Sequence, residues 1–194
     1  MAVNRRVLIA SLGVAVVVSI LGGWAISRGD ADGFDPEDDI TLGTPGVVQI
    51  PSIETNASVA GTQLPTAMLE DNAGNSVSTA DLVGQPLVIN YWYSTCAPCK
   101  KELPDFAAVH ADLGDRIRFV GVNPYDTPAV NETFARDRGV QYELLRDPGD
   151  SYGSTIGVAT APFTIFVRAD GTIARQTGVL DEATLRQYAE ELLG

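Results

Sequence analysis

Cysteine and histidine are scarce in this chain, which has two Cys and one His among 194 residues. A closed zinc site takes four ligands, often from two Cys pairs, so a site built here would need a carboxylate as well. A c-type haem attachment needs His directly after the second Cys, and position 100 is Lys. These absences exclude a haem tether and disfavour zinc, and they leave Cys96 and Cys99 to be explained.

Clustered positive charge is also missing. The chain carries 13 Lys and Arg against 25 Asp and Glu, a formal net charge of −12. The longest basic run outside the N-terminus is Lys100–Lys101. Proteins that bind nucleic acid hold the phosphates with grouped Lys and Arg. The sequence therefore predicts no nucleic-acid partner.

One long stretch without charge occurs near the N-terminus, from Val7 to Ser27, directly after Arg5–Arg6. Its length matches the roughly 20 apolar residues that span a bilayer as a helix. Basic residues before it predict that residues 1–6 are cytoplasmic, that 7–27 form an uncleaved transmembrane signal-anchor, and that the rest is extracytoplasmic. A cleaved signal peptide is the alternative, although its apolar region is usually shorter. We also predict an acidic linker over 28–62, with Gly and Pro but few large apolar residues.

A globular domain is predicted over residues 63–194. The run 86–92 is almost continuously apolar, as expected of a strand buried on both faces. Strands are predicted within 67–82 (two), 86–92, 117–122 and 163–178 (a hairpin). Helices are predicted from Ala97, from Pro128 to Gly139 and after the capping residue Asp181. This order indicates an α/β fold, a mixed central sheet with helices on both faces.

The spacing of Cys96 and Cys99 is typical of redox chemistry. A structural disulfide would close a very short loop, which gains the least stabilisation. The predicted strand runs into Cys96 and the predicted helix follows it, so Cys96 would sit at a helix N-terminus. The unpaired N–H groups and the helix dipole favour a thiolate there. Cys99 lies one turn further along, and Pro104 should kink the helix.

The stretch "VINYWYSTCAPCKKELP", together with "DPGDSYGSTIGVATAPFTIFVRADGTI" at 147–173, resembles the thioredoxin-like superfamily. With the predicted anchor, the chain is most similar to the TlpA/ResA type of membrane-tethered thiol–disulfide oxidoreductase. The resemblance implies a thioredoxin-like fold, with Cys96 as the attacking and Cys99 as the resolving cysteine. It also implies that Pro162 follows a cis peptide bond, which lets the Ala161 backbone present an unpaired edge to a substrate.

Glu102 matches an acid that helps to set the cysteine pKa values in ResA-type proteins. Two positions depart from the wider pattern: Thr95 stands where many relatives have Trp, and Asn90 stands where thioredoxins have a buried Asp. Because Asn90 cannot carry a proton, its presence favours Glu102 as the proton carrier. The alternative is that Glu102 is simply a solvated helix residue. His110 is expected at the surface or its boundary.

The function that this resemblance implies is extracytoplasmic thiol–disulfide exchange with substrate proteins, without a cofactor besides the Cys96–Cys99 disulfide. We expect reduction of specific proteins such as apocytochrome c, with electrons from a membrane partner. A thiol oxidase or disulfide isomerase is an alternative, and a Cu(I) metallochaperone is one of another class. A peroxiredoxin is disfavoured because its family pattern has Thr three residues before the reactive Cys, where this chain has Tyr93.

Overall fold

The computed structural model describes residues 56–194. The predicted membrane span and most of the predicted linker lie outside these residues. In the described part of the chain, none of the helices combines the length and the apolar character that crossing a membrane requires.

A single seven-stranded mixed sheet organises the domain, in the order β2-β1-β5-β4-β3-β6-β7. In its centre β3 runs parallel to β4 and antiparallel to β6. The strands are β1 (Met68–Asp71), β2 (Ser76–Ser78), β3 (Leu87–Tyr91), β4 (Arg118–Asn123), β5 (Glu143–Arg146), β6 (Phe163–Val167) and β7 (Ile173–Thr177).

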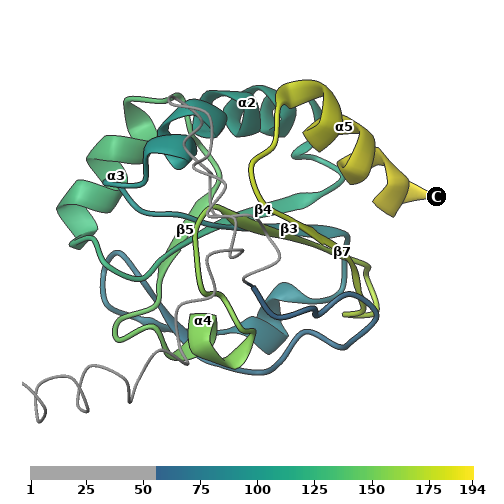
Figure 1. Ribbon diagram of the computed structural model, residues 1–194, viewed down its shortest axis with the longest axis horizontal. Coiled ribbons are helices and arrows are strands. Elements are labelled where there is room, and N and C mark those ends of the chain that lie inside the picture. Colours follow the sequence, from purple (N-terminus) through teal and green to yellow (C-terminus); the bar gives the residue numbers. More distant parts are fainter. Residues whose placement is uncertain (1–55) are drawn as a thin grey trace, which may run out of the picture. The chain divides into compact units, whose positions relative to one another are not determined.

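Helices cover both faces of this sheet, as Figure 1 shows, with α2, α3 and α5 on one face and α4 on the other. Their bounds are α2 (Ala97–Leu113), α3 (Pro128–Arg136), α4 (Ser151–Thr155) and α5 (Glu182–Glu190), with short 3-10 turns η2 (Thr79–Leu82) and η3 (Glu191–Leu193). The α/β architecture predicted from the sequence is confirmed. The helix after Pro128 ends at Arg136, before the predicted Gly139, which adopts a left-handed φ of 78°.

The two faces of the sheet bury separate apolar clusters, and β3 contributes to both. Its residues are all buried, and alternate side chains point to opposite faces. Val88 joins the cluster beneath α2, whereas Leu87 and Ile89 join the cluster on the α4 face. This double burial explains why the sequence from 86 to 92 is nearly without polar residues.

Residues 56–62, which the sequence assigned to the linker, pack against the domain. The Ala57 N–H donates to the Gly157 carbonyl at 2.8 Å, and the Gly61 N–H donates to the Ile173 carbonyl at 2.8 Å. The Ile173 N–H in turn donates to the Thr62 carbonyl at 2.8 Å. The packed domain therefore extends beyond the boundary that composition predicted at Gln63. The sequence did not indicate this, because main-chain contacts leave no periodic pattern.

Candidate active site

The two cysteines lie where the central strand meets its helix. Cys96 is the N-cap of α2, and its Sγ accepts a hydrogen bond from the Cys99 N–H at 3.2 Å. The two residues form a disulfide. Cys96 is 5% exposed and Cys99 is fully buried. The predicted position at the helix N-terminus is confirmed, and solvent reaches Cys96 rather than Cys99.

The loop before Cys96 is fastened to the end of β4 by the carboxylate of Asp126. The Ser94 N–H and hydroxyl each donate to this carboxylate at 2.7 Å, and the Asn123 side chain donates at 2.7 Å. No motif in the sequence singled out Asp126. Its position just after a predicted buried strand was the available signal, since the carboxyl ends of parallel strands form the functional edge of such sheets.

Pro162 lies beside this loop and follows a cis peptide bond from Ala161, as the resemblance implied. Ala161 packs against the apolar cluster that contains Cys96 and Cys99. Among residues 56–194, neither the N–H nor the carbonyl of Ala161 has a hydrogen-bond partner. Its main chain is therefore free to pair with another polypeptide next to the disulfide.

Asn56 holds the segment that leads to Pro162. Its side-chain oxygen accepts hydrogen bonds from the N–H groups of Ala159 at 2.6 Å and Thr160 at 2.9 Å. Its amide group donates to the Thr160 carbonyl at 3.2 Å, and the residue is only 7% exposed. No local pattern indicates this role, because the partners lie more than a hundred positions away along the chain.

We expect Asn56→Ala to lower the free energy of unfolding by about 2–3 kcal/mol, because it leaves main-chain groups of this segment without partners. Thiol–disulfide exchange should slow as well, since the Ala161 edge loses its support. Urea unfolding and an exchange assay measure the two effects. Ser58→Ala, at an exposed neighbour, is the control. Equal stability of the two variants would show that Asn56 does not hold this segment.

Glu102 lies inside the protein. It is 1% exposed, so the alternative of a solvated helix residue is wrong. One carboxylate oxygen accepts a hydrogen bond from the Asn90 side chain at 3.0 Å, and the other accepts one from the Leu180 N–H at 3.2 Å. Burial raises the pKa of Glu102 from 4.5 to about 8, against the lowering effect of these two hydrogen bonds. Glu102 can thus hold or release a proton near neutral pH.

Asn90, which donates to Glu102, has a side-chain oxygen that is buried without a partner among the described residues. The hydroxyl of Tyr142, whose pKa is raised by burial and in part by the charge of Glu102, is likewise buried without a partner there. Asn90 also donates to the Thr164 hydroxyl at 3.0 Å. Because Asn90 can turn its amide, its side-chain oxygen can accept a hydrogen bond from the O–H of a protonated Glu102. This arrangement suits a carboxyl that changes its protonation state.

His110 lies at the boundary of the core, as expected, and the two aromatic residues before Cys96 differ in burial. Trp92 is fully buried and stacks on Phe134 with 5.5 Å between the ring centroids. Tyr93 is half-buried at the rim. His110 is also half-buried, at the boundary of the core.

A mixed sheet in which a Cys–x–x–Cys helix N-terminus faces a cis-proline segment defines a thioredoxin-like thiol–disulfide oxidoreductase. The sequence matches the AhpC/TSA family over residues 60–187, and the chain belongs to this family. It is 35% identical over 140 residues to the thiol:disulfide interchange protein HelX of Rhodobacter capsulatus, covering 70% of this chain and 78% of HelX.

Other comparisons agree with this class. The thiol-disulfide oxidoreductase ResA of Bacillus subtilis (strain 168) is 26% identical over 130 residues, covering 66% of this chain and 73% of ResA. A crystal structure from Chlorobium tepidum, described as a thiol:disulfide interchange protein DsbE, superposes with a TM-score of 0.64 at 21% identity. That match covers 71% of this chain and all of the other, and it shows the shared fold.

Proposed function

We propose that this oxidoreductase works outside the cytoplasm as a reductant of specific proteins. The supporting observation is the slightly exposed Cys96 at the N-terminus of α2, with fully buried Cys99 behind it. The Ala161 main chain, which has no hydrogen-bond partner among residues 56–194, lies beside it. The Cys96 thiolate attacks one sulfur of a substrate disulfide. That S–S bond breaks, and the released substrate thiolate takes up a proton.

Cys99 completes the reaction. It gives up its proton and attacks the Sγ of Cys96 in the mixed disulfide, so that the second substrate sulfur leaves as a thiolate and is protonated. Two electrons have then passed from the protein dithiol to the substrate disulfide. Glu102 lies one turn beyond Cys99 on the buried side of α2 and is suited to accept the Cys99 proton.

The same carboxyl supports the proposed direction of electron flow. A thiol–disulfide protein is a strong oxidant when its reduced form is stabilised, as by a low-pKa thiolate. A nearby carboxylate opposes the thiolate by like-charge repulsion. Alkylation trapping in cells should therefore find Cys96 and Cys99 mainly as thiols. A mainly oxidised pair would favour a thiol oxidase, and tight binding of Cu(I) by the reduced protein would favour a metallochaperone.

Apocytochrome c is the proposed substrate, and the proposal comes from the likeness to the TlpA/ResA type. Its haem-binding cysteines must be reduced before haem is attached. Cells that lack this protein should lose covalently bound haem, detected by haem staining of denatured proteins. The wild-type gene should restore it, and a Cys96→Ser gene should not. Normal haem attachment in the deletion would exclude this substrate.

The proposed location rests on the uncharged run Val7–Ser27 after Arg5–Arg6. Full-length protein should stay with the membrane after a carbonate wash, because a transmembrane helix is not released by high pH. Protease added outside the cell should digest the domain. A soluble species that begins near Arg28 would show instead that the segment is a cleaved signal peptide. We also propose that the electron donor is a membrane protein, because the proposed anchor holds the domain at the membrane.

A further inference from the structure

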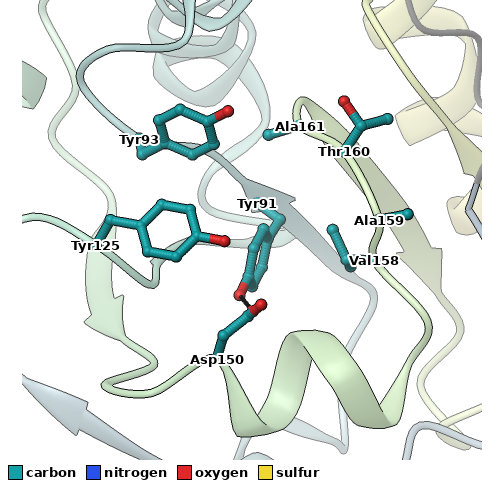
Figure 2. Close-up of a pocket in the computed structure, with 8 residues that line it drawn as sticks. All are labelled: Tyr91, Tyr93, Tyr125, Asp150, Val158, Ala159, Thr160 and Ala161. Carbon is teal, nitrogen blue, oxygen red and sulfur yellow. Dashed lines mark hydrogen bonds between the residues drawn. The ribbon is translucent and has the colours of Figure 1, made fainter. Parts of the chain in front are cut away.

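A small pocket adjoins the active site and has no part in the exchange steps described above. Its cavity measures about 80 Å³. Figure 2 shows three tyrosines, Tyr91, Tyr93 and Tyr125, facing the segment 158–161, with Asp150 at one end. The pocket is large enough for the end of one side chain, and it is lined by both aromatic and acidic groups.

Negative charge gathers at the end formed by Asp150. The Tyr91 hydroxyl donates to Asp150, as the dashed line in Figure 2 marks, and also lies 3.2 Å from a carboxylate oxygen of Asp147. Within residues 56–194, neither carboxylate forms a salt bridge. Buried Asp147 is satisfied by the N–H groups of Tyr152 and Gly153. Asp150 lines the pocket and brings it an uncompensated charge.

The aromatic walls suit the same kind of ligand. Tyr93 and Tyr125 meet edge to face with 5.1 Å between the ring centroids. Tyr125 is 65% exposed, so much of its ring is accessible to a ligand. The faces of aromatic rings attract cations, and a carboxylate adds to that attraction. A neutral or acidic group would gain little from these surroundings.

The pocket opens onto the place where a substrate chain would lie. Tyr93 accepts a hydrogen bond through its carbonyl from the Cys96 N–H at 3.1 Å, so one wall is joined to the reactive cysteine. Ala161, at the other side, has the unpaired main-chain edge. In an extended peptide, residues two apart face the same way and lie about 7 Å from each other. A substrate cysteine facing Cys96 would thus direct the residue two positions away toward this pocket.

We propose that this pocket binds the side-chain ammonium or guanidinium of a Lys or Arg that lies two residues from the substrate cysteine. The proposal rests on the proposed function, because it presumes that a polypeptide is held against Ala161. Asp150 supplies the opposite charge, and Tyr93 and Tyr125 supply the ring faces. The pocket thereby selects basic segments among the possible substrate proteins.

The test uses short peptides with one cysteine, activated as a mixed disulfide with neutral 2-thiopyridine. Lys or the uncharged norleucine stands two residues before or two residues after the cysteine. The reduced protein releases pyridine-2-thione as Cys96 becomes linked to the peptide, and stopped-flow absorbance gives the rate. In one of the two positions we expect Lys to react about five- to tenfold faster than norleucine. High salt should diminish this preference.

Variants distinguish the effect of the pocket from the effect of the overall negative charge of the protein. Asp150→Asn keeps an acceptor for the Tyr91 hydroxyl, and Asn tolerates the left-handed φ of 59° at this position. It should reduce the preference for Lys to less than about twofold, as should Tyr125→Leu. Asp115→Asn makes the same charge change at an exposed position beyond the far end of α2 and should retain the full preference.

Three outcomes would count against the proposal. Equal rates for Lys and norleucine peptides in the wild type would overturn it, while the exchange activity itself would stand. If the preference for Lys is the same in Asp150→Asn as in Asp115→Asn, the effect comes from the net charge rather than from the pocket. That result would overturn the proposal too. If the wild type reacts with no peptide faster than Cys96→Ser does, the proposed function fails and the pocket proposal fails with it.

Discussion

Replacing Cys96 by Ser is expected to slow thiol–disulfide exchange by roughly 10³-fold or more, because the nucleophile itself is removed. Cys96 is the cysteine that solvent reaches, and its sulfur lies at the N-terminus of α2 where a thiolate is stabilised. Cys99 is fully buried and cannot meet a large substrate directly. Reduction of a protein disulfide, followed as loss of the substrate's disulfide form, measures the effect.

Cys99→Ser is the matched variant, and its expected behaviour differs. It keeps the attacking thiolate, so it should still form the mixed disulfide but cannot resolve it. Natural partners should therefore remain attached to Cys99→Ser and be visible on non-reducing gels, whereas Cys96→Ser should trap few. Equal trapping by both variants would show that the attacking and resolving roles have been assigned wrongly.

Glu102→Gln is expected to remove a large pH dependence from the stability of the oxidised protein. The pKa of Glu102 is about 8 in the folded protein, whereas its ordinary value is 4.5. The folded state thus binds this proton more tightly than the unfolded state, and stability falls as pH rises from about 4.5 through 8. One pKa unit corresponds to about 1.4 kcal/mol. Over this pH range the free energy of unfolding of the wild type should therefore fall by roughly 4 kcal/mol relative to that of Glu102→Gln.

The substitution suits the site. The Gln oxygen can accept from the Leu180 N–H, and its amide can donate to the Asn90 oxygen once that side chain turns. Urea unfolding at pH 5, 7 and 9 measures the effect, with Glu132→Gln at an exposed position of α3 as the control. If wild type and Glu102→Gln show the same slope with pH, the carboxyl does not titrate as its burial indicates.

Glu102→Gln should also change the thiols of the reduced protein. An ionised Glu102 repels a thiolate, so the variant should show a lower apparent pKa for Cys96, measured by the absorbance of the thiolate. If the carboxyl and the thiolate interact strongly, the wild-type curve belongs to the pair rather than to one residue. Exchange near neutral pH should slow, since Cys99 loses its proton acceptor. Identical thiolate titrations in the two proteins would exclude this role.

Local sequence patterns predicted most of the secondary structure. Three features follow from neighbours in the chain: the apolar run that forms β3, the Cys–x–x–Cys at the start of α2, and the capping residue Asp181. The strand β5 was not predicted, because its sequence ELLR shows neither alternation nor a long apolar run. β5 pairs with β4 and β1, which are distant in sequence, and those pairings define it.

By itself the sequence determined the redox pair, because Cys96 and Cys99 lie within one helical turn of each other. The resemblance carried by this pair together with the distant stretch 147–173 implied the thioredoxin-like fold and the oxidoreductase class. Only the tertiary structure decided that Glu102 is buried, since the Leu180 N–H that accompanies it lies 78 residues away. The support from Asn56 and the pocket around Asp150 likewise join segments that no local pattern connects. Burial and charge depend on what packs around a residue, and that is settled only when the chain has folded.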